Sequence, residues 1–129
     1  MYSKRRLFAR GRMPAGVMNK TEKAYSQHLE RRKMMGNVCT WWFERIKLKV
    51  AQGTCWFEPD FMVLLMNGEV ELHDVKGSRK VVQDDALVKA KAIASQYPFR
   101  MVFVYPVKGS PGAWEEEEVG GPDAFQIGG

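Results

Sequence analysis

The sequence predicts an α/β fold in which one mixed sheet is flanked by helices. Hydrophobic patterns alternate between helical and strand spacing in the order helix, strand, strand, strand, helix, strand. The pair Asn67-Gly68 between two extended runs is the strongest hairpin signal in the chain. The second helical pattern ends at Pro98, before a short apolar run, as expected of a helix that crosses over to a central strand. With 129 residues, 45% of them hydrophobic, the chain suits a single domain.

The first predicted helix begins at Asn19 and ends before Gly36. Asn19 followed three residues later by Glu22 is the pattern of a capping box, in which each side chain accepts a hydrogen bond from the other residue's backbone. Tyr25 and Leu29 follow at helical spacing, on the same stripe as Glu22. This stripe is therefore expected to meet the sheet.

Three extended segments follow the first helix. Residues 41–50 alternate between an apolar face and a basic face, residues 55–66 form a second run, and residues 70–76 return after the Asn67-Gly68 turn. We expect each segment to be one strand. The basic face of the first segment consists of Arg45, Lys47 and Lys49.

A second helix and a fourth strand complete the predicted core. Apolar residues recur at helical spacing over residues 86–97, and residues 100–105 form a short apolar run that fits a buried strand. The chain is thus expected to comprise a basic flexible arm over residues 1–18, a core over residues 19–108 and an acidic irregular tail over residues 109–129.

Composition excludes several classes of protein. The sequence has no run close to the ~18 to 20 apolar residues of a membrane span, and its basic start has no apolar segment behind it. We therefore expect neither a membrane protein nor a secreted one, but a cytoplasmic protein. Cys39 and Cys55 lack the spacing of a metal site and are expected to be reduced thiols, not a disulfide.

The charge distribution points to a polyanionic partner. All 20 Lys and Arg residues precede residue 109, whereas five of the 15 acidic residues follow it, so residues 1–108 carry a formal net charge of +10. A basic body favours nucleic acid through phosphate neutralisation. The basic residues of the arm either lie along a phosphate backbone or are merely solvated: Lys4, Arg5, Arg6, Arg10 and Arg12. Lys89 and Lys91 on the second helix present the same two alternatives.

Four charged side chains lie on faces that should be buried. Asp74 and Lys76 end the apolar face of the third extended segment, and Asp60 shares the apolar face of the second. Glu22 lies on the apolar stripe of the first helix. Each also has a purely structural explanation. Asp74 and Lys76 would form an ion pair at the end of a strand, Asp60 would begin a strand after a proline, and Glu22 would close a capping box. Together, three carboxylates and a lysine at the ends of elements suit a hard divalent cation that handles phosphate.

These residues resemble a known family. Pro59-Asp60, followed across a hairpin by Asp74-Val75-Lys76, with Glu22 on the preceding helix, is similar to the motif of the PD-(D/E)xK nuclease superfamily. The resemblance extends over about residues 19–106 and is greatest to small phage-encoded endonucleases that resolve junctions or select DNA structures. It implies a restriction-endonuclease-like domain with an αβββαβ core.

The resemblance also implies a set of roles. Asp60 and Asp74 would bind Mg²⁺, for which Mn²⁺ would substitute, with help from the Val75 carbonyl. Lys76 would position the attacking water. Glu22 would complete the metal shell directly or through water, and Glu44, on the inner face of the first extended segment, is the second candidate for that role. His73 points to the face opposite Asp74 and receives no role.

This interpretation requires a particular hairpin. A regular two-residue Asn67-Gly68 turn would oppose Asp60 to Val75 and put Asp74 on the wrong face. A three-residue loop that starts at Met66, with a left-handed Gly68, would oppose the two aspartates. We therefore predict an odd-length loop or a bulge.

The expected function is Mg²⁺-dependent hydrolysis of DNA phosphodiesters, with Asp60, Asp74, Lys76 and Glu22 as catalytic residues. By family analogy, branched DNA such as Holliday junctions or flaps in phage-type recombination or replication is the first substrate, in the cytoplasm of the host. A homodimer is possible, since a four-way junction needs paired incisions, and Trp41 and Phe43 either serve its interface or cover the second face of the sheet.

Two other functions stay open. One is a nucleic-acid-binding module without catalysis, in which the basic surface binds phosphate and the carboxylates are structural. The other is a ribonuclease, which is ranked lower because the sequence contains no recognisable RNA-reading motif.

Overall fold

The computed structural model describes residues 14–50, 55–78 and 84–120. Five strands form a mixed sheet in the order β1-β4-β5-β6-β7, in which β5 and β6 run parallel and the other neighbours antiparallel. Two short strands, β2 and β3, form a separate ribbon. The predicted α/β class with a mixed sheet is confirmed. The elements are α2 (Lys20–Met34), β1 (Val38–Phe43), β2 (Leu48–Lys49), β3 (Trp56–Phe57), β4 (Phe61–Leu65), β5 (Val70–Val75), α3 (Asp84–Gln96), β6 (Arg100–Pro106) and β7 (Trp114–Val119).

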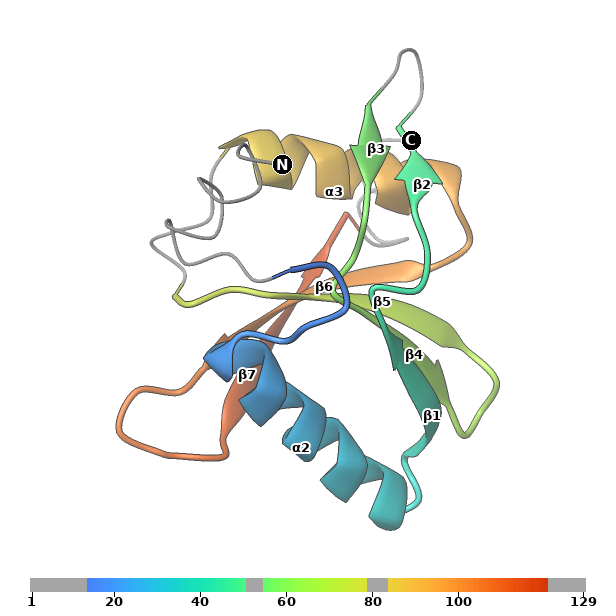
Figure 1. The fold of residues 1–129 in the computed structure, drawn as a ribbon. Helices are drawn as coiled ribbons and strands as arrows, with labels where there is room; N and C mark the ends of the chain where they lie inside the picture. The colour runs from blue at the N-terminus through green and yellow to red at the C-terminus, as the bar shows by residue number, and fades with distance from the viewer. Residues whose placement is uncertain (1–13, 51–54, 79–83, 121–129) are drawn as a thin grey trace.

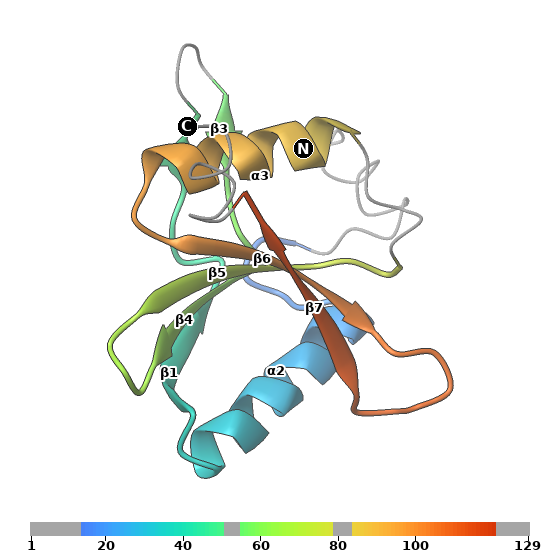
Figure 2. The ribbon, with the colours of Figure 1, turned by 180° about the vertical axis from the view of Figure 1, so that it is seen from behind.

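The two helices cover opposite faces of the sheet (Figures 1 and 2). On one face, Tyr25 of α2 is fully buried against strand residues such as Phe61. On the other face, Ile93 of α3 packs into a core that includes Leu72 and Phe103. Because both faces are covered, the interior strand β6 is apolar along nearly its whole length, as its sequence predicts.

The first helix begins as predicted. The Asn19 side chain accepts a hydrogen bond from the Glu22 backbone N–H at 2.8 Å, and the Glu22 carboxylate accepts one from the Asn19 N–H at 2.9 Å. This capping box fixes the direction in which the Glu22 side chain leaves the helix, at the end of α2 nearest the aspartates.

The first two predicted extended segments are each divided. Residues 41–50, expected as one strand, contain the end of β1 and all of β2, and they break at Glu44, whose backbone φ is +48°. Residues 55–66 contain β3 and β4 and break around Pro59, which cannot donate to a ladder. The alternation of apolar and polar residues continues across the first break, so the sequence pattern does not reveal it.

The prediction of an irregular tail over residues 109–129 is wrong for residues 114–119. These residues form β7, which pairs antiparallel with β6 at the edge of the sheet. The run of glutamates concealed the strand, because Glu is depleted in strands and the run has no apolar alternation. Val119 anchors the strand in the core, and Glu116 pairs with Arg32 of α2 at 3.6 Å. The exposed charges also protect this edge from pairing with other chains.

The hairpin between β4 and β5 has the loop that the nuclease interpretation requires. Phe61 opposes His73, and Leu64 opposes Val70. The Leu65 N–H donates to the Glu69 carbonyl, which leaves a three-residue loop, and Gly68 is left-handed with φ +93°. The prediction of an odd-length loop is therefore confirmed.

A chain of buried polar contacts joins α2 to the sheet, on the face opposite the aspartates. The Tyr25 hydroxyl lies 2.6 Å from Nδ1 of His73, and Nε2 of His73 lies 2.8 Å from the Glu71 carboxylate. The other Glu71 oxygen accepts from Arg100 at 3.0 Å. All groups are satisfied when Nε2 carries the proton and Nδ1 accepts from the tyrosine. His73 is fully buried.

His28 makes the stability of the fold depend on pH. It packs against the rings of Tyr25 and Trp114, at centroid distances of 5.4 and 6.2 Å. Burial, followed by the charges of Arg32 and Arg31, lowers the pKa of His28 from 6.5 to about 4. Between these values the unfolded chain binds a proton that the folded chain does not bind, so this residue lowers stability progressively as the pH falls from 6.5 to 4.

We therefore expect His28→Gln to become relatively more stable than the native protein as the pH falls. The difference in free energy of unfolding between the two proteins should be constant above pH 7 and should move in favour of the variant between pH 6.5 and 4. Urea unfolding at a series of pH values measures this difference. A difference that stays constant across that range would contradict the assignment.

Candidate active site

Asp60 and Asp74 meet at the end of the β4–β5 hairpin that lies away from its turn. The register that opposes Phe61 to His73 brings Asp60, which directly precedes β4, level with Asp74 of β5. The Asp60 backbone N–H donates to the Asp74 carboxylate at 3.2 Å, and the Val75 N–H donates to the Asp60 carboxylate at 2.8 Å. Each carboxylate is thus oriented by the backbone of the other strand.

Lys76 lies beside these carboxylates. Its ammonium is 2.9 Å from Oδ2 of Asp74 and 5.2 Å from the centre of the Phe103 ring. Its backbone N–H donates to the Val104 carbonyl at 2.9 Å, which extends the parallel pairing of β5 with β6 by one residue. About a fifth of the Lys76 side chain is exposed, so the ammonium is held in place but can reach a bound molecule.

Glu22 reaches the aspartates from the first turn of α2. Burial raises the pKa of Glu22, the Asn19 backbone opposes this shift, and the neighbouring carboxylates of Glu44 and Asp74 raise it further. The carboxyl group of Asp60 acts in the opposite direction and lowers the pKa of Glu22. The helix that covers one face of the sheet therefore extends a carboxylate to the hairpin end where the aspartates lie.

Glu44, the second candidate for completing the metal shell, lies at the rim of the site. Its backbone N–H donates to the Asp60 carbonyl at 2.9 Å, and its carboxylate accepts from the Gly16 N–H at 2.7 Å. Both candidate carboxylates accept a backbone hydrogen bond, Glu44 from Gly16 and Glu22 from Asn19. The charge of Glu22 also helps to raise the pKa of Asp60, so Glu22 remains the first candidate for the role.

The surroundings of Asp60 strongly disfavour the charged form of its carboxylate. Burial, and next the charge of Asp74, raise the pKa of Asp60 to about 9, and Glu22 adds to this shift. The Val75 N–H and the Lys76 ammonium only partly offset these effects. Carboxylates packed together against their own repulsion are a common feature of sites that bind cations or transfer protons.

The donor set fits a hard divalent cation that retains water. Among residues 14–50, 55–78 and 84–120, no cluster of three or more His, Cys, Asp or Glu side chains is arranged to hold a metal ion. Mg²⁺ usually takes one or two carboxylates, with water and substrate phosphate filling its other positions. Asp60 and Asp74 are therefore the residues that would hold Mg²⁺ or Mn²⁺, with help from the carbonyl of Val75, whose N–H binds Asp60. Glu22 would act directly or through water.

The other sequence-predicted residues lie away from this site or outside the described part of the chain. The arm residues, Lys4, Arg5, Arg6, Arg10 and Arg12, lie outside the described residues. Lys89 pairs with Asp85 at 3.9 Å on α3, and Lys91 is exposed on the same helix. Trp41 and Phe43 pack edge-on or tilted against Phe61, which is the covering role that the sequence left open.

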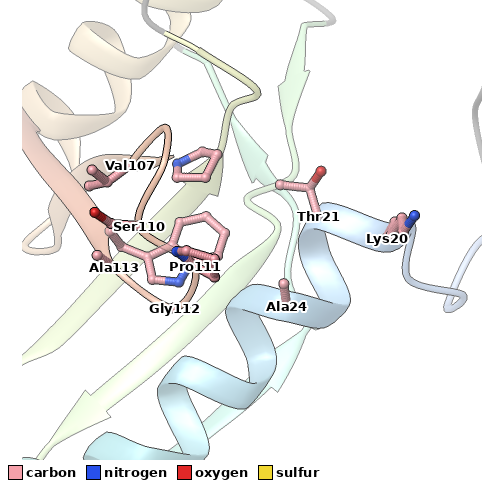
Figure 3. Close-up of a pocket in the computed structure, with 10 residues that line it drawn as sticks. Lys20, Thr21, Ala24, Val107, Ser110, Pro111, Gly112 and Ala113 are labelled. Atoms are coloured by element: carbon pink, nitrogen blue, oxygen red, sulfur yellow. The ribbon is translucent and has the colours of Figure 1, made fainter.

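A pocket of about 300 Å³ lies between the first turns of α2 and the β6–β7 loop (Figure 3). Lys20, Thr21 and Ala24 line it from the helix, and Ser110 and Pro111 line it from the loop. No carboxylate lines this pocket, which is therefore separate from the Asp60–Asp74 cluster.

Sequence reasoning missed the two-stranded ribbon and its exposed tryptophan. Glu44 and Asp60 are bonded at its base, and Trp56 of β3 is 55% exposed. The available signal was Trp56 next to Phe57, since adjacent strand residues face opposite sides and only one of the two can be buried.

Comparisons of the chain with protein-family models, with curated proteins and with solved structures found no match. None of the helices in the described ranges is long and apolar enough to cross a membrane. Cys39 and Cys55 are exposed and form no disulfide.

Proposed function

We propose that this protein is a Mg²⁺-dependent DNA endonuclease of the PD-(D/E)xK type, with a restriction-endonuclease-like core. The observation that carries the proposal is that Asp60 and Lys76 both lie against the Asp74 carboxylate at the end of the β4–β5 hairpin. The three-residue loop is required for this placement, because a two-residue turn would separate the aspartates.

The residues of the site have separable roles in phosphodiester hydrolysis. Asp74 holds the Lys76 ammonium, which can donate hydrogen bonds to an attacking water and orient it towards phosphorus. Asp60 is itself oriented by the Val75 N–H, which donates to one of its two carboxylate oxygens. Mg²⁺ bound there would supply the positive charge that offsets charge developing on the phosphate. Glu22 would hold a water at the margin of the site.

The proposed substrate is DNA, with branched forms such as junctions and flaps first. The first 108 residues are strongly basic, which favours a polyanion. The choice of branched DNA, of phage-type recombination or replication and of a host-cytoplasm location rests on the resemblance to phage-encoded junction endonucleases. A homodimer would supply the paired incisions that a junction needs.

A nucleic-acid-binding module without catalysis is the second candidate. It is favoured by the ion pair of Asp74 with Lys76, which a purely structural strand end would also form. The two candidates differ in their dependence on metal. A labelled four-way junction, a flap and a linear duplex should be incubated with the protein in Mg²⁺ and in EDTA. Cleavage in Mg²⁺ alone supports the nuclease, and gel shifts without cleavage support the binding module.

A further inference from the structure

The β2–β3 ribbon has one apolar face and one exposed face. Leu48 opposes Phe57, which is 8% exposed and packs in the core beneath α3. Lys49 opposes Trp56, and both are exposed. Alternation puts Arg45 and Lys47 on the same exposed face. The ribbon is therefore anchored by one side and presents a basic and aromatic side to solvent.

The exposed tryptophan has no structural explanation among the described residues. Trp56 is 55% exposed, and neither of the hydrophobic cores includes it. An open hollow of about 530 Å³ is lined by Trp56, Lys47 and Glu58. The described residues provide no ion pair for Lys47 or Lys49. Among the described residues, the face thus combines an aromatic ring with two lysines that have no ion-pair partner.

The ribbon rises directly from the candidate catalytic residues. Its two strands leave the sheet at Glu44 and Asp60, and the Glu44 N–H donates to the Asp60 carbonyl at 2.9 Å. Trp56 precedes Asp60 by four residues, an extended span of about 13 Å. Nucleotides stack at about 3.4 Å each, so Trp56 is within about four nucleotides of a phosphate bound at Asp60. Figure 1 shows the ribbon projecting beside α3, far from the C-terminal end of α2.

We propose that the exposed face of the β2–β3 ribbon binds the unpaired strand of a branched DNA, with Trp56 stacking on a base and Lys47 and Lys49 binding its phosphates. The ribbon proposal rests on the proposed nuclease function, and it explains why that nuclease would prefer branched substrates. Aromatic stacking accepts every base, and nearby cations neutralise the backbone, which are the two features of single-strand binding. A blunt duplex presents no base to Trp56 along its length and gains only the phosphate contacts.

The test measures binding without cleavage. The full chain is titrated in EDTA with a fluorescently labelled flap, a short single strand and a blunt duplex. We expect Trp56→Ala to weaken binding of the flap and the single strand roughly 5- to 100-fold and to leave duplex binding nearly unchanged. Lys47→Ala should weaken binding of all three DNAs. It should also reduce the slope of log affinity against log salt concentration by about 1 for each DNA, as expected when one phosphate contact is lost. Trp56→Phe should restore most of the affinity that Trp56→Ala loses.

The controls remove similar groups at the far end of the molecule. Met34 and Lys33 are exposed near the C-terminal end of α2, and Met34→Ala and Lys33→Ala should bind all three DNAs as the native protein does. Thermal unfolding of each variant checks that it is folded. Tryptophan fluorescence gives a direct readout. Single-stranded DNA should quench the fluorescence of the native protein more than that of Trp56→Phe, which lacks the stacking tryptophan.

Two outcomes would overturn the proposal. One is unchanged flap and single-strand binding by Trp56→Ala, and the other is an equal loss on all three DNAs, which would place the ribbon in a duplex groove. The result is independent of catalysis. If the native protein cleaves no DNA in Mg²⁺ but Trp56→Ala loses flap binding, the nuclease proposal fails and the ribbon proposal stands. If the native protein cleaves DNA in Mg²⁺ but Trp56→Ala binds normally, the nuclease proposal stands and the ribbon proposal fails.

Discussion

Asp74→Asn should reduce DNA cleavage about 10³-fold, at the upper end of the loss seen when a group that stabilises transition-state charge is removed. Asp74 is expected to have two effects, because one of its oxygens holds Lys76 at 2.9 Å, and its carboxylate, bound to the Asp60 N–H at 3.2 Å, is a proposed ligand of the cation. Binding of uncleaved DNA should be retained or strengthened, since the change removes a negative charge that repels phosphate.

The matched control is Asp85→Asn, the same chemical change at an exposed position on α3. It should cleave at the native rate. A second readout tests the metal directly: Mg²⁺ should raise the melting temperature of the native protein and of Asp85→Asn, but not that of Asp74→Asn, because a ligand that binds only the folded state stabilises it. Native cleavage by Asp74→Asn would remove this residue from the proposed mechanism.

His73→Ala should lower the free energy of unfolding by about 3–5 kcal/mol. His73 is fully buried and bonded to both the Tyr25 hydroxyl and the Glu71 carboxylate. Burial acts to raise the pKa of Glu71, but the hydrogen bond with His73, together with the charge of Arg100, holds it below its ordinary value. Removal of His73 therefore leaves a buried carboxylate with one partner fewer, and a cavity beside it.

Tyr25→Phe separates the hydroxyl from the rest of this contact chain. It should cost about 1–3 kcal/mol, because it leaves only Nδ1 of His73 without a partner and keeps the ring packed. Urea unfolding of the two single variants and the double variant measures the coupling between the residues. A loss below about 1 kcal/mol in His73→Ala would show that the contacts with Tyr25 and Glu71 contribute little to stability.

The catalytic candidates were predictable because local rules determine their placement. The sequence pattern Asn19 to Glu22 predicts the capping box, and the requirement that Asp60 and Asp74 share a face predicts the odd-length loop. A left-handed Gly68 supplies that loop, and glycine adopts positive φ without strain. Because the pairing is regular along both strands, the turn also determines which residues oppose each other at the far end of the hairpin.

Features that depend on tertiary contacts were not predictable. At the break, Glu44 adopts a φ of +48°, which is uncommon for a residue other than glycine. Hydrogen bonds from Glu44 to Asp60 and from Gly16 to Glu44 hold this conformation. The break creates the ribbon and exposes Trp56. Glutamates such as Glu116 are tolerated in β7 because a helix that lies far away in the sequence provides Arg32.

The most direct test of the nuclease proposal compares the native protein with Lys76→Ala on a labelled four-way junction, a flap and a linear duplex in Mg²⁺. Lys76 contacts Asp74 and Phe103 and is partly exposed, so the variant should fold and bind DNA. We predict that the native protein cleaves at least the branched substrates and that cleavage is lost in EDTA and in Lys76→Ala. Intact substrates that are shifted by both proteins in a gel would contradict it and would leave a binding module.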